Sequence, residues 1–145
     1  MFKIKEATSQ AQHKKARALA IFYITLTLAY MVTIYRFSSL PGSQVSLPAP
    51  DYVMHALEYF GLGVLLGLTA RSAVNMYKTS ARPSNSHFLA PIFIGFAYAL
   101  SDEFHQFFVP GRNASVSDLL ADLSGVIAAQ ILLQYWLSTR ATSSR

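Results

Sequence analysis

Four apolar runs separated by polar segments dominate the pattern of this chain. They cover residues 18–35, 52–70, 88–100 and 119–137. The first run carries no charge and is about long enough to span the hydrocarbon of a bilayer, which takes roughly 20 helical residues. The third continues into a stretch where polar residues interleave with phenylalanines. The pattern predicts an all-α membrane protein, a bundle of four transmembrane helices in up-down-up-down order.

The polar segments define the organisation around these runs. We predict a basic leader (1–17), a four-helix membrane domain (18–137) and a short tail (138–145), with loops at 36–50, 71–87 and 110–117. A basic leader before an apolar run is also typical of a signal peptide. However, no small-x-small cleavage pattern closes the run and Arg36 follows it, so we interpret it as an uncleaved first span.

Composition agrees with a membrane protein. Of the 145 residues, 52% are hydrophobic and 13% are charged, too few charges to coat a soluble domain of this size. The absence of cysteine excludes disulfides, zinc–thiolate sites and thiol nucleophiles. The chain also contains no GxSxG, HExxH or P-loop motif, which leaves the familiar chemistries of those motifs without support.

The two signs of charge occupy different segments. Ten of the twelve Lys and Arg residues lie in the leader, the middle loop and the tail, whereas six of the seven acidic residues lie in or beside the other two loops. The positive-inside rule then predicts a multi-pass protein of the cytoplasmic (inner) membrane with both termini in the cytoplasm. The same rule and anionic lipids account for the net charge of +5, so we expect membrane lipids as partners and no nucleic acid.

Asp51, His55 and Glu58 form the first polar group, at the expected outer end of the second span. Spacings of four and three residues place them on one helical face. Ionisable side chains are costly in hydrocarbon, so they must face the bundle interior, be neutralised or be paired. A site is one explanation, and an interhelical hydrogen bond that merely holds the bundle together is the other.

The segment SDEFHQFFVPGR supplies the second group. Asp102, His105 and Gln106 can share a helical face, with Glu103 turned away by about 100°. Arg112 follows a Pro-Gly turn and is the one basic residue of its loop. A guanidinium there either balances the carboxylates or binds phosphate or carboxylate in a bidentate manner.

The third group opens the fourth span. Ser115 or Ser117 can cap the helix, and Asp118 suits the positive end of its dipole. Asp122 lies one turn deeper on the same face, and two stacked carboxylates repel unless a positive group or a proton intervenes. Small residues at regular spacing permit close helix approach, namely Gly125 and Ala129 here and Gly61, Gly63 and Gly67 in the second span.

On these residues the sequence resembles the VanZ-like family of small bacterial membrane proteins. The first block, DYVMHALEYFGLG, matches at Asp51, His55, Tyr59, Phe60 and Gly63. The second, SDEFHQFFVPGRNASVSDLLADLSG, matches at Ser101, Asp102, Glu103, Gln106, Pro110, Gly111, Arg112, Asp118 and Gly125. The chain departs from the family pattern at Tyr52 (often Lys), Asp122 (often Asn) and Ala129 (often Gly). The resemblance implies a protein of the bacterial cell envelope, linked in some members to teicoplanin resistance.

Three functions follow from these observations. The first is an outward-facing site for a lipid-linked phosphate headgroup or a surface glycopolymer precursor, whether catalytic or only binding. The second is a structural or partner-binding membrane protein whose polar residues lock the bundle. The third is a transporter, which with four spans would need an oligomer.

The residues expected at such a site divide by role. As catalytic candidates we assign His55, Glu58, Asp102, Glu103 and Asp122. As ligand-binding candidates we assign Asp51, Gln106, Arg112, Ser115 and Asp118. A divalent cation is a candidate cofactor, and carboxylate oxygens would favour Mg²⁺, Mn²⁺ or Ca²⁺.

Overall fold

A computed structural model describes residues 2–46, 48–77 and 86–143, and within these ranges the chain is helical with no strand. Its elements are α1 (Phe2–Ser38), the 3₁₀ turn η1 (Gly42–Gln44), α2 (Asp51–Tyr77), α3 (Ser86–Gln106) and α4 (Val116–Ser143). The all-α class with four helices is confirmed. Residues 78–85 of the predicted middle loop lie outside the described residues.

The helices run further than the apolar runs that predicted them. Helix α1 begins at Phe2 and so includes the leader, α2 continues past Arg71, and α4 continues past Arg140. Lys, Arg, Gln and Ala are good helix formers. Helical hydrogen bonding therefore persists beyond the point where the chain stops being apolar.

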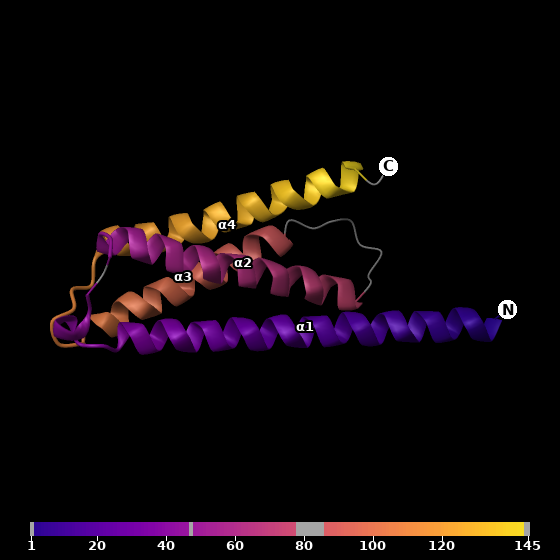
Figure 1. Cartoon of the computed structure of the whole chain (residues 1–145), viewed down its shortest axis with the longest axis horizontal. Helices are drawn as coiled ribbons and strands as arrows, with labels where there is room; N and C mark the ends of the chain where they lie inside the picture. The colour runs from indigo at the N-terminus through magenta and orange to yellow at the C-terminus, as the bar shows by residue number, and fades with distance from the viewer. Residues whose placement is uncertain (1, 47, 78–85, 144–145) are drawn as a thin grey trace.

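Successive helices run in opposite directions, as Figure 1 shows. The first residues of α1 and the last of α4 lie at one end of the molecule. The other end carries the connections between α1 and α2 and between α3 and α4. We call this second end, formed by residues 39–46, 48–50 and 107–115 with the adjoining helix turns, the loop end. It collects the first turns of α2 and α4 and the last turns of α1 and α3.

The core is small and the outer surface is apolar. Buried side chains from all four helices form the core cluster, namely Ile34, Tyr59, Leu62, Leu66, Ala99 and Val126. Large apolar side chains such as Phe22, Phe93 and Ile131 point outward, and more than half of the surface of each is accessible to solvent. An outer surface of this kind suits contact with lipid chains.

Three of the described helices are long and apolar enough to cross a membrane, and they contribute the segments Gln10–Ser38, Asp51–Val74 and Val116–Arg140. Helix α3 is not among these three. Its apolar run ends at Leu100, and the polar residues from Ser101 to Gln106 complete the helix. Three of the four predicted spans therefore have the required length and composition.

Helices α2 and α4 pack most closely, and small residues permit it. A Cβ atom on Gly125 would collide with the backbone carbonyl of Ala56, and one on Gly63 would lie 2.9 Å from the Cα of Val126. This confirms the predicted close approach at both positions. Gly61 instead faces α1, where its Cβ would meet the hydroxyl of Tyr30.

Candidate functional site

His55 and Asp122 meet at the loop end, across the close contact of α2 and α4. The Nδ1 of His55 lies 3.0 Å from Oδ1 of Asp122, at hydrogen-bond distance, and both side chains are buried. The second carboxylate oxygen of Asp122, Oδ2, is buried with no hydrogen-bond partner. This pair thus joins α2 to α4.

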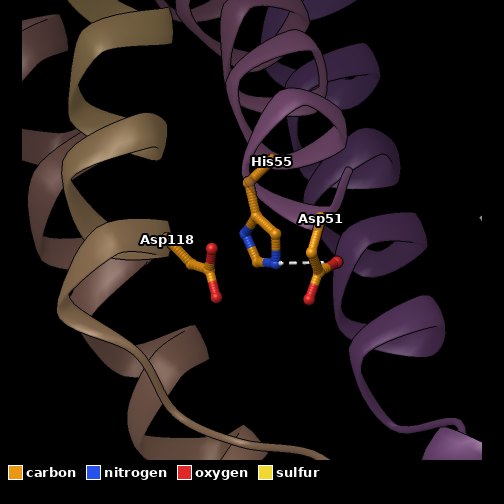
Figure 2. Close-up of side chains that lie close together, drawn as sticks. All are labelled: Asp51, His55 and Asp118. Carbon is orange, nitrogen blue, oxygen red and sulfur yellow. Dashed lines mark ion pairs between the residues drawn. The ribbon is translucent and has the colours of Figure 1, made fainter. Parts of the chain in front are cut away.

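Two further carboxylates lie beside the imidazole of His55. Figure 2 shows the imidazole between Asp51, one turn earlier on α2, and Asp118, in the first turn of α4. The Nε2 of His55 lies 3.9 Å from Oδ1 of Asp51. Asp118 is buried, whereas the side chain of Asp51 is about half exposed. The imidazole therefore joins an outer pair of carboxylates to the inner carboxylate of Asp122.

Glu103 belongs to this cluster, although it lies about 100° around α3 from Asp102. It is buried, and it lies close to His55 and Asp122, with one atom from each of the three within 4.8 Å of the others. Its Oε2 accepts the backbone N–H of Ser115 at 2.7 Å, while Oε1 has no partner. Because other helices flank α3, two of its faces 100° apart are both interior.

Asp102 and Gln106 also lie inside the bundle, next to each other on α3. The Gln106 side-chain amide donates to Oδ2 of Asp102 at 3.3 Å, and Oδ1 of Asp102 is buried and unpartnered. His105, expected on their face, points elsewhere. Its Nε2 lies 3.0 Å from the hydroxyl of Ser39, and its ring packs 4.7 Å from that of Tyr35. His105 therefore ties α3 to the end of α1 and does not join the cluster.

Ser115 is the N-cap of α4. Its hydroxyl accepts the backbone N–H of Ser117 at 3.1 Å, and its carbonyl accepts the N–H of Leu119 at the same distance. Of the two predicted capping residues, Ser115 has this role. Its side chain caps the helix, and its backbone N–H donates a hydrogen bond to Glu103.

Two hollows open beside the cluster. The larger, about 570 Å³, is lined by Asp51, His55, Glu58 and Arg112 together with apolar residues of α1, α2 and the first loop. The smaller, about 380 Å³, shares Asp51 and Arg112 and adds Asp118. Arg112 is half-buried, its Nε has no hydrogen-bond partner, and it forms no ion pair with a described carboxylate.

The sequence motifs of this site belong to a known family. A model of the VanZ/LLP1 family matches residues 2–137, nearly the whole chain. The chain belongs to the VanZ/LLP1 family. The resemblance on the Asp-His and Pro-Gly-Arg blocks is thereby confirmed. No curated protein and no solved structure matches the chain.

In this VanZ/LLP1 protein the two loops of the site touch. The N–H of Gly42 donates to the carbonyl of Pro110 at 3.0 Å. Gly111 adopts φ +74°, a left-handed conformation that favours glycine, and a Cβ on Gly42 would collide with the Gly111 carbonyl. The contact holds the Pro-Gly-Arg turn against the first loop and so fixes the position of the Arg112 backbone.

Sequence reasoning missed polar residues deeper in the VanZ/LLP1 bundle. The hydroxyl of Tyr59 is buried without a partner, and the amide of Gln130 donates to the carbonyl of Gly63 at 2.6 Å. The hydroxyl of Tyr98 donates to the carbonyl of Met31 at 2.6 Å. A signal existed for Tyr59, which lies four residues after His55 and hence on its helical face.

Proposed function

We propose that the loop end faces the outside of the bacterial cytoplasmic membrane and binds the anionic headgroup of a lipid-linked envelope precursor. The observation that carries this proposal is Arg112. It lines the 570 Å³ hollow beside Asp51, His55 and Glu58, yet it forms no ion pair with them. A guanidinium without a carboxylate partner is free for bidentate contact with a phosphate.

The walls of that hollow support a lipid rather than a free sugar or nucleotide. Apolar side chains form part of them, among them Phe37, Leu40 and Met54. Phe37 and Leu57 are also exposed on the outer surface. A headgroup at Arg112 could therefore keep its hydrocarbon chain along an apolar wall continuous with the bilayer.

The proposal includes a topology of four spans with both termini in the cytoplasm. Helix α3 would complete the set as a shorter apolar span whose polar end, from Ser101 onward, reaches the loop end. The charge separation between the two ends supports this orientation.

Labelling of single cysteines tests this topology cleanly, because the chain has no cysteine of its own. Variants Ser43→Cys and Asn113→Cys should react with a membrane-impermeant maleimide in whole cells, and Asn75→Cys should react only after lysis. Reaction of Asn75→Cys in intact cells would refute the topology, and with it an outward-facing site.

Binding is tested with the purified protein in nanodiscs and a long-chain polyprenyl monophosphate, measured by native mass spectrometry. Loss of a charged hydrogen-bond donor costs about 1.5–3 kcal/mol, so Arg112→Ala should weaken binding about tenfold or more. Arg36→Ala is the matched control, because Arg36 is exposed at the end of α1 near the same end of the bundle. Equal affinities for the two variants would contradict the proposal.

The cellular role we propose is an influence on susceptibility to glycopeptides such as teicoplanin. In a susceptibility assay Arg112→Ala should lose the effect of the unaltered protein at equal expression. A purely structural role for the polar residues predicts the opposite, because Arg112 is on a loop and its truncation leaves no buried cavity. Arg112→Ala would then retain full activity.

A further inference from the structure

We propose that Asp51, His55 and Asp118 bind one divalent transition-metal ion, with Asp122 holding the imidazole in place from behind. The ligands would be Nε2 of His55 and one oxygen from each of the two aspartates. This assignment does not depend on the proposed lipid ligand. It rests on four observations: the distances among the three side chains, the contact of His55 with Asp122, the burial of Asp118 and the charge of the loop end.

The distances suit ligands of one ion. One atom from each of the three side chains lies within 4.8 Å of the other two, and Nε2 is 3.9 Å from Oδ1 of Asp51. That second distance is too long for a hydrogen bond. Ligands bound at about 2.0–2.2 Å from a shared ion lie about 3–4 Å from one another. Small rotations of the half-exposed Asp51 would complete this geometry.

Asp122 prepares the histidine for metal binding. Its Oδ1 lies 3.0 Å from Nδ1, so an ionised Asp122 accepts the Nδ1 proton and leaves Nε2 unprotonated on the side of the ring near Asp51. Metal-binding histidines generally donate their second ring N–H to a carboxylate or carbonyl in this way. The arrangement of Asp122 behind His55, with Asp51 and Asp118 beyond the imidazole, is typical of a metal site.

Asp118 supplies an independent argument for a bound cation. It is 8% exposed, and its carboxylate makes no hydrogen bond with the described residues. Figure 2 shows it directed toward the imidazole of His55. Burial of an ionised carboxylate is costly, and the dipole of α4 offsets only part of that cost. A bound cation would offset the remainder.

The charge of the whole loop end points the same way. Six carboxylates face it from three helices, Asp51 and Glu58 from α2, Asp102 and Glu103 from α3, and Asp118 and Asp122 from α4. The basic residues at this end are Arg36 and Arg112, with His55 and His105 positive only if protonated. A divalent ion would reduce this excess of negative charge where the carboxylates are closest. It would also allow an anionic headgroup to approach the same end.

One imidazole and two carboxylates favour a first-row ion such as Mn²⁺ or Zn²⁺ over Ca²⁺, which prefers oxygen ligands alone. Asp51 lines both hollows, so the unfilled positions of the ion would face space open to water or phosphate.

A rival set on the opposite side of the imidazole consists of His55, Glu103 and Asp122, which also come within 4.8 Å of one another. It would use Nδ1, the nitrogen already at hydrogen-bond distance from Asp122. Glu103 is in addition committed to the N–H of Ser115 through one oxygen. We therefore assign the outer set, and the two sets differ in which carboxylate is essential.

The test uses the full chain in nanodiscs of phosphatidylcholine, stripped of metal, with no phosphate lipid present. Mn²⁺ is titrated and the free ion measured by electron paramagnetic resonance, with Zn²⁺ as competitor. We expect one saturable site, weakened at least about tenfold by Asp118→Asn and by Asp51→Asn, and about 10–100-fold by Asp122→Asn. Glu103→Gln, which tests the rival set, should weaken Mn²⁺ binding less than Asp118→Asn does.

Each contrary outcome is decisive. Asp51→Asn changes a half-exposed residue and should fold normally, so weakened binding in that variant cannot be blamed on unfolding. Absence of a saturable site for either ion would overturn the proposal. Loss of binding in Glu103→Gln with retention in Asp118→Asn would move the ion to the inner set and also overturn it. Because no phosphate lipid is added, a failure here is separate from a failure of headgroup binding.

Discussion

Gly125→Ala is the sharpest test of how the site is assembled, because it adds one methyl group at the closest approach of α2 and α4. The new Cβ would lie 2.8 Å from the backbone nitrogen of Phe60 and would collide with the carbonyl of Ala56. Both atoms belong to the backbone of α2, so no side-chain rotation relieves the overlap. The two helices must move apart instead.

The size of the movement sets the expected effect. Ordinary contacts of a Cβ begin at 3.4 Å, so the helices must separate by at least 0.6 Å near Phe60 and by more near Ala56. Overpacking of this kind costs about 1–3 kcal/mol. The His55–Asp122 bond is only one helical turn away at 3.0 Å, and a comparable shift would stretch it beyond hydrogen-bond range.

The assay combines stability with site integrity. Unfolding of Gly125→Ala in detergent should occur at a lower temperature than unfolding of the unaltered protein, and its Mn²⁺ affinity should fall with it. Ser124→Ala is the control, because Ser124 is exposed and its hydroxyl bonds only to the carbonyl of Ala121 in its own helix. Equal stability of Gly125→Ala and Ser124→Ala would refute the argument that close packing of α2 on α4 builds the site.

Three further substitutions probe single contacts. Asp122→Ala leaves the buried Nδ1 of His55 without its partner, so we expect a loss of about 1–3 kcal/mol in unfolding free energy; an unchanged value would show that the pair is not formed. Tyr98→Phe removes the bond to the carbonyl of Met31, worth about 0.6 kcal/mol for an average bond between membrane helices, measurable by denaturant unfolding. Glu58→Gln should leave the unfolding midpoint unchanged but abolish the glycopeptide-susceptibility effect, whereas full activity would exclude an acid–base or cation-linked role for Glu58.

The coarse architecture could be predicted because it follows from local pattern. Four apolar runs gave four helices, and the spacing of Asp51, His55 and Glu58 placed them on one face before any packing was known. Asp122 could be singled out because no cap or dipole explains a carboxylate one turn inside a span. The structure explains this carboxylate by its contact with His55, a residue of another helix.

The rotation of α3 could not be predicted in the same way. Glu103 lies about 100° around the helix from Asp102, whereas His105 was expected beside Asp102. Sequence alone does not say which sides of α3 have neighbouring helices. In the structure Asp102 and Glu103 are buried, and His105 contacts Ser39, directly after the end of α1. That choice depends on where α1, α2 and α4 lie around α3, which is tertiary information.

The alternating direction of the helices explains how one end of the bundle can accommodate so many carboxylates. Two helix N-termini, those of α2 and α4, lie there, and the positive ends of their dipoles favour Asp51 and Asp118. The carboxylates on α3 lie at a helix C-terminus, where the dipole disfavours them. Glu103 is compensated by the N–H of Ser115 at the start of α4, so one helix end offsets the cost of another. No helix N-terminus compensates Asp102 in this way, and one of its oxygens has no hydrogen-bond partner. A cation bound at the loop end would therefore stabilise Asp102 in particular.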